Sequence, residues 1–347
     1  MKTIHHIPSR RADGFTLIEL MISMTIGFVL VIGMGVLLMS QNSARNEIDK
    51  QARQIESGRY ATDVLSTELN LAGYFGQLYV TDAALTTEPN PCSILPFDLD
   101  AAIAMPVQAF SGLITIPFPT NLLSNCLVSA NHKPGTDVIV VRRADTTAAD
   151  ITALTTGKIY IQSTPSSRIV GIATGSAAAD SAIFSLKQKD GVTVAPIAAY
   201  IVRIYFVSPC NNFASGQSSC TAYADGGSPV PTLKRMELTV VSLLPTFSLV
   251  PIVDNIDELR FDYGIDTNSD GASDILTNTP TTAQEAQIAT VGVNLLARNF
   301  EITTGSGVDK SYTLGLAGTF GPYNDYYKRH AYTTTARVIN ASGRNQQ

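Results

Sequence analysis

The most constraining feature of this chain is a long apolar run close to its amino terminus. The 25 residues from Phe15 to Met39 contain one charged residue, Glu19, and no proline. At a rise of about 1.5 Å per residue, a helix of this length can cross the hydrocarbon core of a bilayer. The run is too apolar for the core helix of an ordinary soluble domain, so residues 15–39 are predicted to form a transmembrane helix.

The residues on either side of this run determine which kind of membrane segment it is. A short basic leader, residues 1–14, precedes it. A secretory signal peptide would have a shorter apolar region followed by an A-x-A-like cleavage site. Residues 40–43 read Ser-Gln-Asn-Ser and do not fit that pattern. We therefore expect the processing signal to lie before the apolar run, at Gly14–Phe15.

The stretch R-R-A-D-G-F-T-L-I-E-L, residues 10–20, resembles the type IV prepilin family. The resemblance implies that a prepilin peptidase cuts after Gly14 and that the new N-terminal residue, Phe15, is methylated. Asp13 departs from the family pattern, because an acidic residue directly precedes the cleavage glycine. We expect it to slow processing without abolishing it.

Glu19 needs a partner if it enters a membrane, because an ionised carboxylate in a membrane helix costs a few kcal/mol or more. After cleavage, the Phe15 amine would lie four residues away. The resemblance implies that Glu19 neutralises the N-terminal amine of an adjacent subunit during assembly. The alternative is a polar residue that is tolerated near the membrane interface.

The helical pattern continues beyond the apolar run. Residues 40–72 contain no proline and a single glycine, Gly58, and apolar residues recur at helical spacing. The sequence predicts one helix from about Phe15 to Leu71, ended by Gly73. Residues 40–73 would be its amphipathic spine. A long N-terminal helix packed on an antiparallel β-sheet head is the α+β architecture of pilins. Major pilins commonly have a proline in the first half of this helix, and this chain has none.

The remainder of the chain is predicted to be a loop-rich insertion, residues 74–135, followed by a β-rich head, residues 136–347. The insertion contains seven prolines, and its residues 112–116 read as a short strand. In the head, β-branched and aromatic runs predict the strands. Their ranges are 136–142, 158–162, 182–186, 199–207, 234–241, 256–263, 286–299 and 335–340.

The four cysteines, Cys92, Cys126, Cys210 and Cys220, all follow the apolar run. Basic residues before the run, and none directly after it, place most of the chain outside the cytoplasm, where disulfides form. Three pairings are open. We predict Cys92–Cys126 and Cys210–Cys220, because each pair brackets a loop rich in proline, serine or asparagine. The second pair would close a tight hairpin loop.

Four motifs near the carboxyl end resemble those of the minor pilin PilW family. In chain order they are V-x-N-I-x-x-L-x-F-x-Y-G-x-D at 253–266, V-x-V-x-L-L-x-R at 291–298, Y-x-R at 327–329 and R-V-x-N at 337–340. The resemblance covers the N-terminal helix and about the last 150 residues, whereas residues 74–190 contribute little to it.

A D-x-N-x-D-G sequence in the same region is a candidate calcium site. Asp266, Asn268 and Asp270 place oxygen atoms at alternate positions, as in an EF-hand loop. The twelfth position is Thr277 instead of glutamate, and Asp274 at the ninth could substitute in part. The alternative is a hairpin turn in which the same side chains bind backbone N–H groups. The expectation for cofactors is therefore none, with Ca²⁺ as the hypothesis to test.

Catalysis and nucleic-acid binding find little support. No nucleophile–base motif or P-loop is present, and the formal net charge is -5 without a run of basic residues. We expect a non-enzymatic minor pilin, anchored once in the inner membrane with a periplasmic head and then moved to the pilus and cell surface. The implied partners are other minor pilins, the major pilin, the prepilin peptidase and the inner-membrane assembly platform. The alternatives are a J-like pseudopilin of type II secretion and a pilus-tip adhesin.

Overall fold

The computed structural model describes residues 14, 16–79, 85, 87–118, 126–303 and 309–341. The chain forms two compact units, Met1–Ala52 and Arg53–Gln347. The predicted domain borders at residues 14, 39, 73 and 135 stay a prediction.

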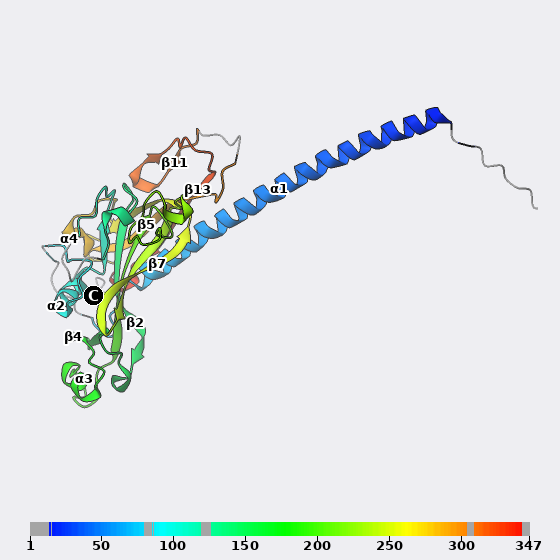
Figure 1. Ribbon diagram of the computed structural model, residues 1–347. Coiled ribbons are helices and arrows are strands. Elements are labelled where there is room, and N and C mark those ends of the chain that lie inside the picture. Colours follow the sequence, from blue (N-terminus) through cyan, green and yellow to red (C-terminus); the bar gives the residue numbers. More distant parts are fainter. Residues whose placement is uncertain are drawn as a thin grey trace, which may run out of the picture. The chain divides into compact units, whose positions relative to one another are not determined.

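Helix α1 (Leu17–Leu71) is a single helix of 55 residues (Figure 1). It ends where Gly73 adopts a φ of +75°, a conformation that favours glycine. There the Gly73 N–H donates to the carbonyl of Arg142 at 3.0 Å. The predicted continuous helix and its glycine stop are confirmed, while Phe15, its expected first residue, lies outside the described residues.

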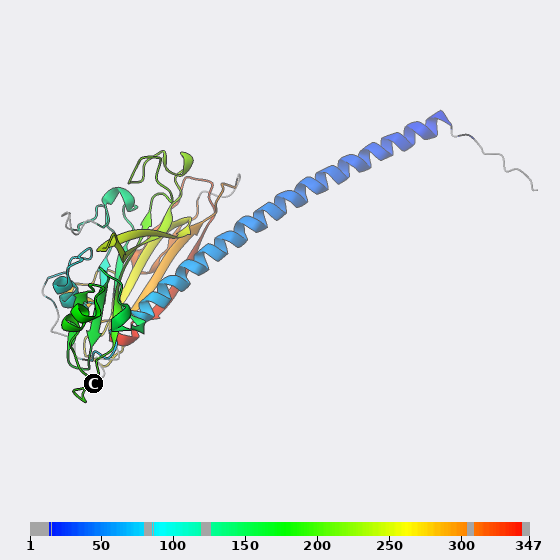
Figure 2. The ribbon, with the colours of Figure 1, turned by 60° about the horizontal axis from the view of Figure 1, so that its bottom comes forward.

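The second unit contains two main antiparallel sheets (Figures 1 and 2). The seven-stranded sheet has the order β1-β2-β5-β3-β4, and β6 pairs with β5 and β7. Its strands are β1 (Val107–Phe110), β2 (Val138–Ala149), β3 (Ile159–Ser163), β4 (Arg168–Ile172), β5 (Ile197–Ser208), β6 (Thr232–Val241) and β7 (Leu244–Asp254). The four-stranded sheet has the order β13-β10-β8-β9. Its strands are β13 (Arg329–Arg337), β10 (Ile288–Arg298), β8 (Ile256–Ile265) and β9 (Ile275–Thr277).

Short elements complete the described part of the unit. The strands β11 (Tyr312–Thr313) and β12 (Thr319–Phe320) pair with each other. The short helices are α2 (Pro96–Ala101), η1 (Ala102–Ala104), η2 (Ser129–Asn131), η3 (Ile151–Ala153), α3 (Ala177–Ile183), η4 (Ala224–Gly226), α4 (Thr282–Glu285) and η5 (Gly315–Ala317).

The second half of α1 packs on both sheets, and the predicted α+β fold is confirmed. Ala61, Leu65 and Leu69 form one core with buried side chains of β2, β5, β8 and β10. These three residues recur at four-residue steps, so they lie on one face of the helix.

A second core lies on the other face of the seven-stranded sheet. Val138 and Val140 of β2 and Ile204 of β5 pack there with Leu99 and Ile103, from the segment between α1 and β2. Strands β2 and β5 are thus buried on both faces, which explains their nearly continuous apolar sequences. Residues 74–135 therefore include part of the core that covers the sheet.

Asp137 joins the two sheets. Its N–H donates to the carbonyl of Leu259 at 3.0 Å, and its carboxylate accepts from the N–H of Phe261 at 2.8 Å. The same carboxylate accepts from Gly112 N–H and Arg260 Nη1. Burial raises the pKa of Asp137, although these donors act in the opposite direction.

Several strand predictions were wrong or incomplete. Residues 182–186 include the end of α3 instead of a strand, because a run of alanines follows Ser176 and the Asp180 carboxylate accepts from Thr174 N–H at 2.7 Å. Residues 112–116 form no strand. The last strand ends at Arg337 instead of continuing to residue 340. Strands β1, β4, β7, β9, β11 and β12 were missed.

Glu285 on α4 protects the edge of the seven-stranded sheet. Its side chain is buried, and Oε1 accepts from the Ala109 N–H of β1 at 2.9 Å. Burial raises its pKa to about 8, with Glu88 acting in the same direction, whereas the Ala109 N–H and Arg142 lower it.

The pKa of Glu285 makes the stability of the fold depend on pH. Because the folded pKa lies above the ordinary value of 4.5, the stabilising contribution is complete below pH 4.5 and is lost as pH rises through about 8. At about 1.4 kcal/mol per pKa unit, the loss is a few kcal/mol. We expect Glu285→Gln to remove most of this dependence. Urea unfolding at pH 5, 7 and 9 tests it, and identical pH dependence in both proteins would contradict it.

Candidate functional site

The first unit presents an apolar helix surface. The large apolar side chains of α1 from Leu17 to Met39 are 52–78% exposed. By length and composition, α1 can cross a membrane. Contiguous apolar surface of this extent marks an interaction with lipid or protein. The arrangement is that of a membrane anchor or a helix-packing surface.

Glu19 forms a capping box with Thr16 at the start of α1. The Thr16 N–H and hydroxyl donate to Glu19 Oε2 at 3.0 and 2.9 Å, and the Glu19 N–H donates to Thr16 Oγ1 at 3.3 Å. The carboxylate therefore has partners within its own chain. Sequence reasoning missed Thr16, although its T-x-x-E spacing is the signature of a capping box.

The processing residues are described only in part. Gly14 is exposed and precedes the helix, as a cleavage site requires. Phe15 lies outside the described residues. Pairing of Glu19 with a Phe15 amine therefore stays a prediction.

Removing the Thr16 hydroxyl should weaken the first turn of α1. Thr16→Val keeps the side-chain shape but loses two of the three capping hydrogen bonds, and the loss of a cap costs about 1 kcal/mol. We expect a several-fold decrease in the fraction of the protein recovered in sheared pili. Thr16→Ser, which keeps the hydroxyl, is the control and should behave like the wild type. Equal recovery of the valine and serine variants would contradict the role of the cap.

Polar contacts anchor the second half of α1 to the head. Glu68 accepts from Arg143 Nη2 at 3.3 Å and also pairs with Arg203 Nη1. Gln54 Nε2 donates to the carbonyls of Ala297 and Lys328 at 2.8 and 3.0 Å. These contacts fix the rotation and axial position of this part of the helix on the sheets.

At Gly58, α1 lies close against the four-stranded sheet. A Cβ at Gly58 would overlap the ring of Tyr332 on β13. The Tyr332 hydroxyl donates to the carbonyl of Gln54 at 3.4 Å. Glycine is therefore required here by packing.

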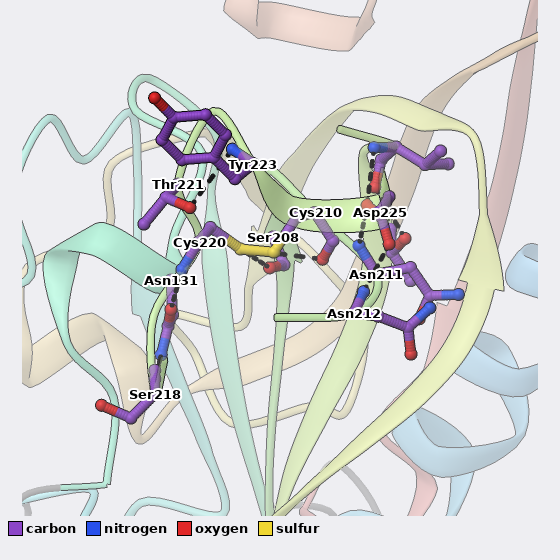
Figure 3. Close-up of a disulfide and its surroundings, with 12 residues drawn as sticks. Asn131, Ser208, Cys210, Asn211, Asn212, Ser218, Cys220, Thr221, Tyr223 and Asp225 are labelled. Carbon is purple, nitrogen blue, oxygen red and sulfur yellow. Dashed lines mark hydrogen bonds between the residues drawn. A yellow bond between two sulfur atoms is a disulfide. The ribbon is translucent and has the colours of Figure 1, made fainter. Parts of the chain in front are cut away.

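Both predicted disulfides, Cys92–Cys126 and Cys210–Cys220, are present. Figure 3 shows the second one, with the Asn131 side chain accepting from the Cys220 N–H at 3.0 Å. The connection between β5 and β6 extends over residues 209–231, so it is longer than the tight hairpin loop expected from the sequence.

Asp225 organises the far end of this connection (Figure 3). Its carboxylate accepts from the N–H groups of Asn211, Asn212 and Val230 at 2.9, 2.6 and 2.9 Å. Burial acts to raise the pKa of Asp225, but these donors outweigh it, and the pKa is lowered. Asp225 thus fixes the loop beside the disulfide.

The candidate calcium loop connects β8 to β9. Asp266 accepts from the N–H groups of Asp270 and Gly271 at 3.2 and 2.8 Å, and Asp274 accepts from the N–H and hydroxyl of Thr267 at 2.8 and 2.7 Å. Asn268 Nδ2 donates to Asp270 and Asp274. These are the hydrogen bonds of the alternative turn.

No group of three His, Cys, Asp or Glu residues within the described residues is arranged to hold a metal ion. Calcium binding by Asp266, Asn268, Asp270 and Asp274 stays a prediction. Calorimetric titration of the protein with calcium tests this prediction. Binding at this loop requires a heat of binding that disappears when Asp266 and Asp270 are replaced by alanine, and no heat, or an unchanged heat, would contradict it.

In comparisons with known proteins, two family models match parts of the chain near its two ends. The family model described as Type IV Pilus-assembly protein W matches residues 217–340, and the model described as Prokaryotic N-terminal methylation motif matches residues 9–35. A solved type IV-like pilin from Thermus thermophilus is similar over 83% of this chain and 98% of its own, with 11% identity and a TM-score of 0.32. No curated protein matches the chain.

Proposed function

We propose that this chain, which matches the PilW family model over residues 217–340 and the N-terminal methylation motif over residues 9–35, is a minor pilin that enters the pilus as a structural subunit and takes part in its assembly. The observation that carries the proposal is the prepilin-type N-terminus directly before an exposed apolar helix surface. A subunit of this kind needs to be held in lipid before assembly and by other helices afterwards.

The proposed route begins with a precursor anchored once in the inner membrane, with its head in the periplasm. The prepilin peptidase cuts after Gly14, and the assembly platform moves the subunit into the pilus. Apolar helix surface leaves the lipid and packs on other pilin helices. Because lipid tails are as apolar as protein side chains, this exchange provides little driving force by itself. A Glu19 carboxylate paired with a neighbouring Phe15 amine would add both energy and axial register.

The function proposed is non-enzymatic, with the major pilin and other minor pilins as direct partners. A J-like pseudopilin would use the same helix in type II secretion, and a tip adhesin would use the head to bind a surface. Gene deletion separates the first two: loss of surface pili and twitching supports the minor pilin, and loss of exoprotein secretion supports the pseudopilin. Binding of the purified head to a surface, in competition with intact pili, would support the adhesin.

Mass spectrometry of the protein recovered from sheared pili tests the proposal directly. We expect a mature chain that begins with methylated Phe15. A chain that retains residues 1–14 in normally assembled pili would overturn the proposal.

A further inference from the structure

Most sheet edges in the described part of the head are protected against pairing with another chain. An open edge exposes a row of backbone donors and acceptors, and proteins usually block it with proline, short strands or covering segments. Strand β7 contains Pro245 and Pro251, which interrupt its row of donors. Strand β9 has three residues.

The other two edges of the seven-stranded sheet are covered. The Ala109 N–H of β1 is bound by Glu285. Strand β4 lies beside α2 and is tied to it by Arg168, whose Nε donates to Asp100 Oδ1 at 2.6 Å. Protection at these edges therefore comes from specific side chains.

Strand β13 has such a contact at one end, where the Tyr312 hydroxyl donates to the Arg329 carbonyl at 3.2 Å, and none over residues 331–337. It runs for nine residues at the margin of the four-stranded sheet (Figure 2). Its register with β10 is continuous from Arg329 to Arg337, without a bulge. Its sequence, R-H-A-Y-T-T-T-A-R, contains no proline, lysine or acidic residue. Within the described chain, residues 331–337 of β13 therefore form a long edge without protection.

The hydrogen-bond pattern shows which residues of β13 face outward. At the two ends of the ladder, the Val338 N–H donates to Ala289 and the Asn299 N–H donates to Lys328, at 2.8 and 2.9 Å. Even-numbered residues of β13 therefore bond to β10, and antiparallel alternation turns the backbone groups of Ala331, Thr333, Thr335 and Arg337 outward. The described residues provide no hydrogen-bond partner for these outward groups. Thr333, Thr335 and Arg337 are exposed.

Strand β13 is fixed in place by packing against the core and against α1. Ala336 lies in the main core, and Tyr332 packs against it and against Gly58 of α1. An edge held in this way is pre-organised, so a pairing strand would not have to order it.

We propose that the open edge of β13 is a strand-addition site, at which an extended segment of a neighbouring subunit continues the four-stranded sheet along residues 331–337. The proposal rests on the proposed function, because a pilus subunit has neighbours at its side. The row of outward N–H and C=O groups is complementary to another β-strand.

The charges of the edge indicate the chemistry of this segment. The charged residues of β13 are Arg329 and Arg337, and both are cationic. Arg329 is already paired with Asp257 and Asp325. A second copy of β13 in antiparallel register would bring its Arg337 opposite this paired Arg329 and gain no acidic partner. The occupant is therefore a strand of a different subunit, with an acidic side chain opposite Arg337 and small or β-branched side chains opposite the threonines.

A proline at an outward position tests the backbone bonds directly. Thr333→Pro removes an outward N–H but no bond to β10. Thr333→Val is the matched control, because both variants lose the hydroxyl bond to Asn294 Oδ1 at 3.0 Å and only the proline loses the donor. We expect the recovery of Thr333→Pro in sheared pili to fall at least tenfold below that of Thr333→Val. Equal recovery of the two would overturn the proposal.

Photocross-linking tests the strand-addition site even if the proline variant fails to fold. With p-benzoylphenylalanine in place of Thr335 in living cells, we expect a cross-link to an acid-containing extended segment of another protein with a prepilin motif, mapped by mass spectrometry. Cross-linking to a second copy of this chain alone, or none in a protein that enters pili, would overturn the proposal. If the wild type is absent from pili but the expected cross-link forms, the proposed function fails and the strand-addition site stands.

Discussion

Replacing Glu68 by alanine should destabilise the head by about 3–5 kcal/mol, because the change leaves buried charges without a partner. The side chains of Glu68, Arg143 and Arg203 are 10, 9 and 16% exposed. Without Glu68, Arg143 loses the carboxylate that it binds, and among the described residues Arg203 keeps Glu237, at 3.2 Å. Since domains of this size are commonly stable by about 5–15 kcal/mol, the loss is a large fraction of the total.

Urea unfolding of a soluble fragment that lacks residues 1–39 would measure the effect of Glu68→Ala. Glu56→Ala is the matched control, because Glu56 lies on the same helix but is exposed. An exposed substitution should change the free energy of unfolding by no more than about 0.5 kcal/mol. A Glu68 variant as stable as the Glu56 variant would show that the ion pairs do not anchor α1.

The helix and the central strands could be predicted from sequence because their signals are local. The apolar run, the spacing of Leu65 and Leu69, and Gly73 together define α1. Strands β2 and β5 have β-branched runs that a helix does not favour. Strand β7 was missed because Pro245 and Pro251 are unusual in a strand, and their effect is tolerated only because β7 lies at an edge.

The polar anchors of the head could not be predicted in the same way. Glu68 is 75 residues from Arg143 and 135 from Arg203, so their contact depends on the completed fold. Asp137 lies in the predicted strand 136–142 but directly precedes β2, and its burial depends on its contacts with β8, which is distant in the sequence. The open edge of β13 is a property of sheet order, which strand propensity does not reveal. Thr16 is different, since its T-x-x-E signal was present in the sequence.

The second large effect is expected for Glu19→Ala, which should reduce recovery in sheared pili by at least about tenfold while cleavage after Gly14 and membrane insertion remain normal. Among residues 15–39, Glu19 carries the only side-chain charge. Alanine leaves the apolar surface intact, so it removes the charge of the carboxylate together with its two hydrogen bonds from Thr16; a partnered charge at membrane depth contributes a few kcal/mol. Immunoblots of pilus and membrane fractions, with mass spectrometry of the N-terminus, measure incorporation and cleavage separately.

Glu56→Ala, which removes an exposed carboxylate from the same helix, is the control and should enter pili normally. Wild-type recovery of Glu19→Ala would mean that the apolar surface alone sets the position of the subunit, and the assembly role of the carboxylate would be wrong.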